Sequence, residues 1–430
     1  MHLKGEIGTM RILHVVHGYP PSVGGSQLLV QHLSEQLVTR YGDRVTVFTT
    51  TARNVEMFWN PREPALPAGT EVINGVTVRR FPVFNRLNTL RRIAAAVGYR
   101  LHLPYNDWFR TIQQGPLVPG MTRAIASSGA DVILATAFPL MHMYYAIAGA
   151  RQGGIPIVLV GAIHTEDRWG YERKMILQAI RRADAYIAYT FYERDYLIVR
   201  GIPEERITVI GGGVDADAFI RANGWVVRER YGWGNNPVIG FVGKQTARKR
   251  LDVLIEAMQR VWNEQPEVHL LLAGAQTPHS LQIAERVKRL PLSQWSQVTI
   301  VTDFREEEKP GLLAACDIFV LPSAEESLGI AFLEAWAAGK PVIGVRAGAI
   351  PSVVDDGRDG LLVPYGDPES LARAILLLLA DPARRTAMGQ AGQKKVRDHY
   401  TWEIFAGRVR EVYQEVLSRY KRNYTWKGEQ

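Results

Sequence analysis

Two carboxylates eight residues apart, Glu326 and Glu334, are the residues whose types and spacing most directly suggest chemistry. Glu326 lies in a polar stretch after a short β-branched and aromatic run, which predicts a buried strand. A helical pattern begins after Gly329, so Glu334 is expected about one turn inside a helix. The amides of Leu328, Gly329 and Ile330 lie between the two acids, where a helix N-terminus favours a phosphate. Because carboxylates favour hydroxyls, a site with both groups predicts a ligand that carries both, such as a sugar nucleotide.

A second group of charged residues follows another buried run. Lys244 and Lys249 lie five residues apart, between that run and a predicted helix. Lysine is a compact cation that suits a phosphate, and two lysines can neutralise a leaving diphosphate without a metal. A basic loop is more often a solvated surface, and a single glutamate is more often a loop or capping acid. The shared position at strand ends favours a ligand site, because open α/β sheets bind ligands there.

The first half of the chain contributes a glycine pair and a histidine. Gly24 and Gly25 lie between a buried run and a predicted helix, where glycines let a ligand approach the backbone. The pattern is not G-x-G-x-x-G, which disfavours a nicotinamide cofactor. His164 follows a later buried strand and is expected at the same edge of the sheet. The alternative for His164 is a loop histidine satisfied by backbone groups.

Composition limits the class of protein. The 430 residues are enough for two domains of about 200 residues each. No apolar run is long enough to span a membrane, and no signal peptide is expected. The single cysteine, Cys316, lies in an apolar run and predicts a core residue in a reducing compartment. The net charge of +8, without a nucleic-acid fold signature, favours an anionic membrane surface over nucleic acid.

The segment 79–110 combines basic and apolar side chains. It holds seven arginines against one acid, Asp107, and interleaves them with leucine and aromatic residues. Cations favour anionic headgroups and apolar side chains favour the acyl boundary, so the segment fits a membrane surface. It fits equally a surface helix whose arginine stems cover apolar neighbours. The arginines are Arg79, Arg80, Arg86, Arg91, Arg92, Arg100 and Arg110.

The stretch around Glu326 and Glu334 resembles the E-x7-E motif of retaining GT-B glycosyltransferases, most closely of glycosyltransferase family 4. Lys244 and Lys249 are similar to the family's Arg/Lys-x4-Lys pattern. The resemblance implies an α/β fold of GT-B type, with two doubly wound Rossmann-like domains facing across a cleft. The expected parts are an N-terminal acceptor-side domain over 1–213, a linker over 214–236, a nucleotide-sugar-binding domain over 237–399 and a C-terminal helix over 400–430 that crosses back.

The resemblance also implies roles for individual residues. Lys244 and Lys249 would hold and neutralise the diphosphate, Glu334 would bind the nucleotide ribose, and Glu326 would hold sugar hydroxyls. His164 would contact the transferred sugar. The predicted catalytic residues are therefore Glu326, His164 and Lys249.

Other family positions would complete the donor site. The amides near Leu328, Gly329 and Ile330 would lie beside the phosphate. Further donor contacts are expected from Gly24 and Gly25 near the phosphates, and from Gly274 and Asp303 beside the base and ribose. The chain departs from the family pattern at Asp303-Phe304, at Ala349 and at Ser352.

The resulting expectation is a retaining glycosyltransferase that uses a nucleoside-diphosphate sugar, needs no metal or other cofactor, and has no protein nucleophile. A glycan or lipid-linked acceptor is expected, in synthesis of a cell-envelope polysaccharide or glycolipid, with no nucleic-acid partner. The expected location is the cytoplasm, at the inner face of the cell membrane if segment 79–110 binds it. The alternatives are a sugar-nucleotide epimerase or phosphorylase on a similar fold, and a non-catalytic sugar-nucleotide-binding subunit.

Overall fold

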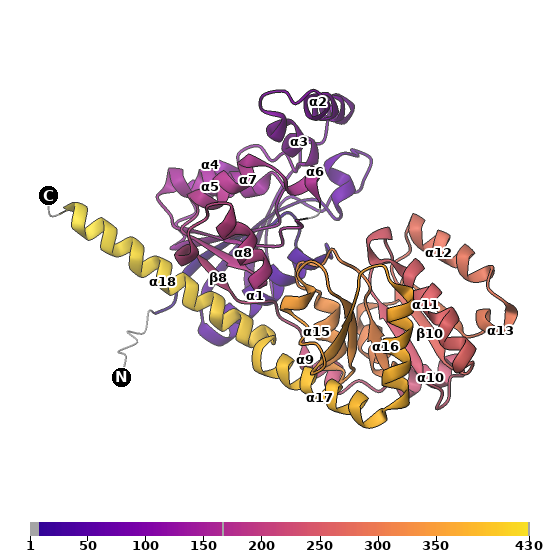
Figure 1. Ribbon diagram of the computed structural model, residues 1–430. Helices are drawn as coiled ribbons and strands as arrows, with labels where there is room; N and C mark the ends of the chain where they lie inside the picture. The colour runs from indigo at the N-terminus through magenta and orange to yellow at the C-terminus, as the bar shows by residue number, and fades with distance from the viewer. Residues whose placement is uncertain (1–7, 166, 429–430) are drawn as a thin grey trace. The chain divides into compact units, whose positions relative to one another are not determined.

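The computed structural model describes residues 8–165 and 167–428, which form two compact units (Figure 1). Unit 1 comprises the chain up to Ile210 together with the chain from Phe405 on, and unit 2 comprises Gly211–Ile404. Residues 1–7 and 429–430, at the outer ends of the expected parts, lie outside the described residues. Each unit is built on one mainly parallel sheet with helices between its strands, so the predicted α/β class with two Rossmann-like domains is confirmed.

The sheet of unit 1 has eight strands in the order β3-β4-β2-β1-β5-β6-β7-β8, and only β3 runs antiparallel. The antiparallel pair is a hairpin closed by Asn74 and Gly75, both at positive φ, as the favoured two-residue turn requires. The strands are β1 (Arg11–Val15), β2 (Arg44–Thr50), β3 (Gly69–Ile73), β4 (Val76–Phe81), β5 (Val132–Thr136), β6 (Ile157–Val160), β7 (Ala185–Ala188) and β8 (Ile207–Val209).

The central strands of unit 1 are buried on both faces, as expected of parallel strands covered by crossover helices. The helices are α1 (Gly25–Tyr41), α2 (Asn88–Arg100), α3 (Asn106–Gln114), α4 (Met121–Ala126), α5 (His142–Gly153), α6 (Arg168–Tyr171), α7 (Lys174–Arg182) and α8 (Phe191–Val199), with short 3-10 turns at Val55–Phe58 and Glu204–Arg206.

The sheet of unit 2 has six parallel strands in the order β11-β10-β9-β12-β13-β14. The chain order reverses between β9 and β12, which makes the carboxyl ends of these strands the expected ligand site. The strands are β9 (Val238–Val242), β10 (His269–Gly274), β11 (Val298–Thr302), β12 (Ile318–Val320), β13 (Val342–Val345) and β14 (Gly360–Val363).

The helices of unit 2 separate these strands in the sequence. They are α9 (Ala216–Ile220), α10 (Trp225–Tyr231), α11 (Leu251–Glu264), α12 (Pro278–Lys288), α13 (Leu292–Trp295), α14 (Lys309–Ala315), α15 (Ile330–Ala337), α16 (Pro368–Ala380) and α17 (Pro382–His399), with 3-10 turns at Ala247–Lys249, Glu306–Glu308 and Ile350–Ser352. Cys316 is buried beside Gly240, as a core residue should be.

Two segments at the domain connection differ in character. The segment 214–236, expected as a linker, forms α9 and α10 and buries Phe219, Val227 and Trp233 within unit 2. Its polar turn residues concealed these short helices. The final helix α18 (Trp402–Gly428) groups with unit 1 from Phe405 on, and Tyr413 is bonded to the buried His14 at 3.0 Å. None of the helices that the structure describes is both long and apolar enough to cross a membrane.

Candidate functional site

The carboxyl ends of four neighbouring strands of unit 2 bring together most of the residues predicted for the donor. Strands β11, β10, β9 and β12 lie side by side, and their ends meet at one edge of the sheet. From β11 to β12 they present Asp303, Gly274, the pair Lys244 and Lys249, and Glu326. Because the sheet is parallel, residues up to 82 positions apart in the sequence thus lie along one edge of it.

Lys249 and Glu326 form the first ion pair of this edge. Lys249 Nζ donates to Glu326 Oε1 at 2.5 Å, and the side chains are 23% and 12% exposed. The contact follows from the pairing of β9 with β12, since each residue lies on the loop that follows one of these strands. Lys244 lies on the same loop as Lys249 but is exposed, and within the described residues no ion pair joins it to a carboxylate.

Glu334 forms a second ion pair, with Lys309, which the sequence did not predict. Lys309 begins α14, and its Nζ donates to Glu334 Oε1 and to Glu306 Oε1, the latter at 3.1 Å. Burial raises the pKa of Glu334, and the ammonium of Lys309 acts against that rise. Burial also disfavours the charge on Lys309, but Glu334 and Glu306 outweigh it and raise the pKa of Lys309. The ammonium of Lys309 therefore opposes the rise in the pKa of Glu334 that burial causes.

The backbone between the two glutamates presents free amides. Gly329 lies at φ +73 and is the N-cap residue of α15, so no side chain caps this helix. The first amides of an α-helix have no partner inside the helix, and the helix dipole makes this end positive. Leu328 and Gly329 are buried and Ile330 is 40% exposed, so the exposed edge of this turn begins at Ile330. The N-terminus of α15 thus lies between two lysine–glutamate pairs, and its expected contact with a phosphate stays a prediction.

Gly274 and Asp303 support the neighbouring strand ends. A Cβ on Gly274 would lie 1.9 Å from the Gly243 carbonyl oxygen, so only glycine allows β9 and β10 to end this close together. Asp303 is at φ +54, and its carboxylate accepts from the Gln276 amide at 3.0 Å. That carboxylate therefore fixes the loop after β10, and its expected contact with the base remains a prediction.

The departures at Ala349 and Ser352 lie beside the glutamate loop. Ala349 is buried, and Ser352 ends a short 3-10 turn. A Cβ on the adjacent Gly348 would lie 2.3 Å from the Ala324 carbonyl oxygen, which shows how closely this turn packs on the loop. A side chain at Gly348 would therefore disturb the loop that carries Glu326.

The predicted residues of unit 1 lie at the carboxyl edge of its own sheet. Gly24 caps the N-terminus of α1 without a side-chain bond, and the space around the Gly25 α-carbon is open. His164 follows β6, and its ring packs edge-on against Tyr171 at 5.3 Å between centroids. The strand order of unit 1 reverses between β1 and β5, so the loop after β1 lies at the switch point and β6 lies two strands from β1.

No cluster of three or more histidine, cysteine, aspartate or glutamate side chains within residues 8–165 and 167–428 is arranged to hold a metal ion. The triplet Asp215-Ala216-Asp217 begins α9, where Asp215 caps the helix by accepting from the Ala218 amide at 3.2 Å. The Asp215 carboxylate therefore serves as the N-cap of α9.

Comparison with known proteins identifies the family. Residues 23–218 match the family model described as Glycosyltransferase Family 4, and residues 236–381 match the model described as Glycosyl transferases group 1. A D-inositol 3-phosphate glycosyltransferase of Streptomyces avermitilis is 30% identical over 314 residues, which cover 66% of this chain and 67% of the relative. This chain belongs to glycosyltransferase family 4.

Other relatives of this family 4 glycosyltransferase match over nearly the whole chain. A GDP-mannose-dependent alpha-(1-6)-phosphatidylinositol monomannoside mannosyltransferase of Mycolicibacterium smegmatis is 27% identical, covering 93% of this chain and 97% of the relative. The structure of Anabaena HepE with UDP and glucose superimposes with a TM-score of 0.72 at 18% identity, covering 94% of this chain and 100% of HepE. Sucrose-phosphate synthase from Thermosynechococcus elongatus gives 0.71 at 21% identity, covering 95% and 100%. These structures confirm the GT-B fold.

Family membership confirms the predicted transferase class. The predicted roles of individual residues in each unit stay predictions. The structure adds Lys309, which sequence patterns missed because its contact with Glu334 depends on how α14 packs beside α15.

Proposed function

We propose that this enzyme transfers a sugar from a nucleoside-diphosphate sugar to an acceptor hydroxyl with retention of the anomeric configuration. The observation that supports the donor site best is the pair of lysine–glutamate contacts flanking the uncapped N-terminus of α15. In the structure Lys249 and Glu326 satisfy each other. A ligand with both phosphate and hydroxyl groups would offer each of them its natural partner.

The proposed roles follow from the charges. Lys249, helped by Lys244 and the α15 amides, would neutralise the diphosphate as it leaves, and Glu326 would hold sugar hydroxyls. Glu334, which is paired with Lys309, would accept from ribose hydroxyls. His164 of unit 1 would contact the sugar.

The reaction breaks the bond between the sugar anomeric carbon and the phosphate oxygen and forms one from that carbon to the acceptor oxygen. The acceptor proton passes to the leaving phosphate, so the products are a glycoside and a nucleoside diphosphate. Retention without a protein nucleophile requires attack on the face that the phosphate leaves, with the phosphate oxygen as base. Preorganised cations at the diphosphate are the main aid that the protein can give to such a step.

GDP-mannose is the first donor to test, because relatives from Mycolicibacterium smegmatis and Corynebacterium glutamicum that match 93% and 94% of this chain are named as GDP-mannose-dependent. The test follows the anomeric proton of the product by NMR. An α-configured donor giving an α-linked product supports the proposal, and a β-linked product refutes retention. Nucleoside diphosphate released as fast without acceptor as with it would favour an epimerase, and donor binding without any turnover would favour a non-catalytic subunit.

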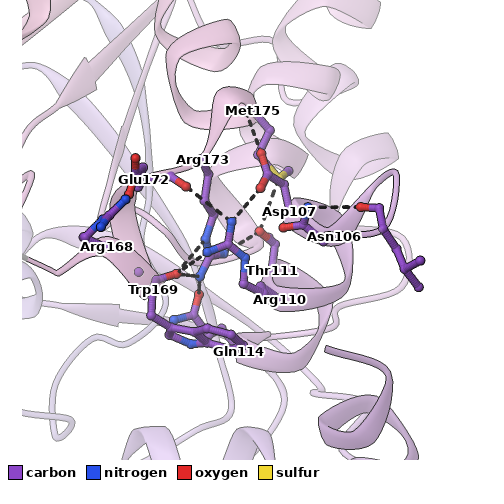
Figure 2. Close-up of polar contacts among 12 residues, drawn as sticks. Asn106, Asp107, Arg110, Thr111, Gln114, Arg168, Trp169, Glu172, Arg173 and Met175 are labelled. Carbon is purple, nitrogen blue, oxygen red and sulfur yellow. Dashed lines mark hydrogen bonds and ion pairs between the residues drawn. The ribbon is translucent and has the colours of Figure 1, made fainter. Parts of the chain in front are cut away.

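We further propose a lipid-linked acceptor reached from an anionic membrane surface, in line with the relatives named as phosphatidylinositol monomannoside mannosyltransferases. Three of the seven arginines in segment 79–110 cannot take part, because they are buried. Their partners are Glu71 for Arg80, the Phe58 carbonyl oxygen for Arg91, and Asp107 with the Trp169 carbonyl oxygen for Arg110. Figure 2 shows Arg110 and Arg173 in the network that joins α3 to α6 and α7. Arg91 and Arg110 hold the hairpin of α2 and α3 in place.

The other side of this hairpin is apolar and basic. On α2 the buried positions are Arg91, Ala95 and Gly98, while Leu90, Ile93 and Val97 are 63%, 54% and 44% exposed. The apolar stripe of this helix therefore faces outward, the reverse of a helix that covers a core. We call the exposed set the outer face: Phe84, Arg86, Leu87, Leu90, Arg92, Ile93, Val97, Arg100, Leu101, Leu103, Tyr105 and Phe109.

Charge argues for an anionic bilayer as the partner of the outer face. The outer face has arginines and no acid, because the one acid of the segment, Asp107, is bonded to Arg110. Each aliphatic side chain that leaves water contributes roughly 1.5–3 kcal/mol, and each surface cation near anionic lipid about 1 kcal/mol. Apolar patches of this extent on soluble proteins usually mark interaction sites.

Vesicle sedimentation tests this part of the proposal. Substituting Leu90→Ser, Ile93→Ser and Val97→Ser together should abolish sedimentation with phosphatidylglycerol-containing vesicles, without lowering the melting temperature. The matched control is Leu281→Ser with Leu292→Ser, two exposed leucines of unit 2, which should sediment like the wild type. Undiminished sedimentation of the triple variant would refute the proposal. A wild-type dimer that becomes a monomer in the triple variant would also refute it.

A further inference from the structure

The loop that carries His164 is held by a buried carboxylate on a different element. Glu193, in the first turn of α8, is 3% exposed. Its Oε1 accepts from the amides of Ala162 at 3.1 Å and Ile163 at 3.2 Å. The same oxygen accepts from the Tyr186 hydroxyl at 2.6 Å, and Oε2 accepts from the Tyr189 amide at 2.8 Å. Both oxygens therefore accept hydrogen bonds, and two of the four donors belong to the loop after β6.

The loop adopts a backbone conformation that needs such support. Ala162 lies at φ +103, where residues with a side chain are rarely found and where strain costs about 1–3 kcal/mol. Such a conformation persists only when its surroundings fix it. A Cβ on the preceding Gly161 would lie 2.1 Å from Glu193 Oε1, so the carboxylate lies directly against two consecutive residues. Glu193 thus determines the path of the chain into His164.

The other side of His164 is also fixed. Its ring packs on Tyr171, whose hydroxyl donates to the Phe138 carbonyl oxygen at 3.0 Å. Tyr171 ends α6, and the carbonyl oxygen of Trp169 in the same turn accepts from Arg110 and Arg173 (Figure 2). The histidine therefore lies between a carboxylate-bound loop and an arginine-bound turn. The carboxylate holds the Ala162 and Ile163 amides, while the Gly161 amide donates to the Ile187 carbonyl oxygen at 2.8 Å.

Burial of a carboxylate costs free energy unless hydrogen bonds compensate for the lost water. Desolvation raises the pKa of Glu193, and its bonds from Tyr186, Tyr189, Ile163 and Ala162 oppose that rise. A buried acid whose donors include two loop amides contributes geometry at that loop. We propose that Glu193 is a positioning residue for His164, setting the direction of the 161–164 loop so that the imidazole meets the transferred sugar. This proposal rests on the role given to His164 under the proposed function.

The test is a double-mutant cycle on turnover. Glu193→Gln keeps the size of the side chain but replaces one acceptor oxygen by an NH2 group. That group cannot accept the hydrogen bonds that the replaced oxygen accepted. We expect kcat to fall about tenfold or more, with no change in the donor concentration that half-saturates the thermal shift. In a His164→Ala background the same change should lower kcat less than about twofold, because the loop no longer positions an imidazole. Tyr186→Phe is the matched control, since it removes a donor to the same oxygen and leaves both loop amides bonded.

Three outcomes decide the matter. An equal loss of kcat from Glu193→Gln in both backgrounds would overturn the positioning role, as would no loss in the wild type. If His164→Ala itself has no effect on kcat, the role of His164 fails first, and the inference about Glu193 fails with it. If Glu193→Gln does not fold, Gly161→Ala perturbs the same contact from the loop side and should show the same dependence on His164.

Discussion

Replacing Lys249 by alanine is the sharpest test of the proposed donor chemistry. The side chain is 23% exposed and its partner Glu326 12% exposed, so the pair is largely but not fully shielded from water. At an effective dielectric constant of about 20, two unit charges 4 Å apart interact by about 4 kcal/mol. Partial exposure lowers this value, and loss of one preorganised charge contact in an active site costs about 2.7 kcal/mol at the low end. We therefore expect Lys249→Ala to lower kcat/KM by at least about 10²-fold.

The neighbouring residue provides the matched control. Arg248 is on the same loop and pairs with Glu325 at 3.3 Å, but its side chain is 54% exposed. Exposed pairs of this kind contribute about 0–1 kcal/mol, so Arg248→Ala should change kcat/KM less than about fivefold. The assay is acceptor-dependent release of nucleoside diphosphate. A loss below about fivefold in Lys249→Ala, or an equal loss in Arg248→Ala, would show that Lys249 does not act on the diphosphate.

Three further predictions concern charge, stability and metal. Lys309→Met should weaken donor binding at neutral pH, and binding should recover as the pH rises. The reason is that the pKa of Glu334, already raised by burial, rises further without its cation. Binding that weakens equally at every pH would contradict this prediction. Arg110→Met should lower the free energy of unfolding in urea by about 3 kcal/mol or more, while the exposed Arg100→Met should change it by less than about 0.5 kcal/mol. A chelator should leave turnover unchanged, and full loss restored by Mg²⁺ would refute the metal-free proposal.

The meeting of Lys249 and Glu326 at one edge of the sheet was predictable from the sequence because each part is local. A buried run, a polar loop and a helix recur at Lys249 and at Glu326, and parallel strands place such loops at one edge. Lys309 was not predictable, because the lysine begins a helix and meets Glu334 only through packing of α14 against α15. Glu193 escaped notice for the same reason, since its partners lie thirty residues away on another loop.

Segment 79–110 shows a different limit of the sequence. Its composition fitted a membrane surface and a surface helix equally, but composition does not say which side of a helix faces the protein. The usual rule would bury Leu90, Ile93 and Val97, yet the structure buries Arg91 with Ala95 and Gly98. The buried carbonyl oxygen of Phe58 that accepts from Arg91 decides this orientation, and it comes from a separate turn of the chain.

The most direct test of the central claim is a thermal-shift measurement of the purified protein with GDP-mannose, and with UDP-, ADP- and dTDP-sugars, in the absence of metal. A donor present at 100 times its Kd should add about 2.7 kcal/mol of stability. The account predicts that one of these donors raises the melting temperature of the wild type and that Glu334→Ala, which removes the ribose contact, weakens this response. A folded protein whose melting temperature no nucleotide sugar changes would contradict the proposed donor site.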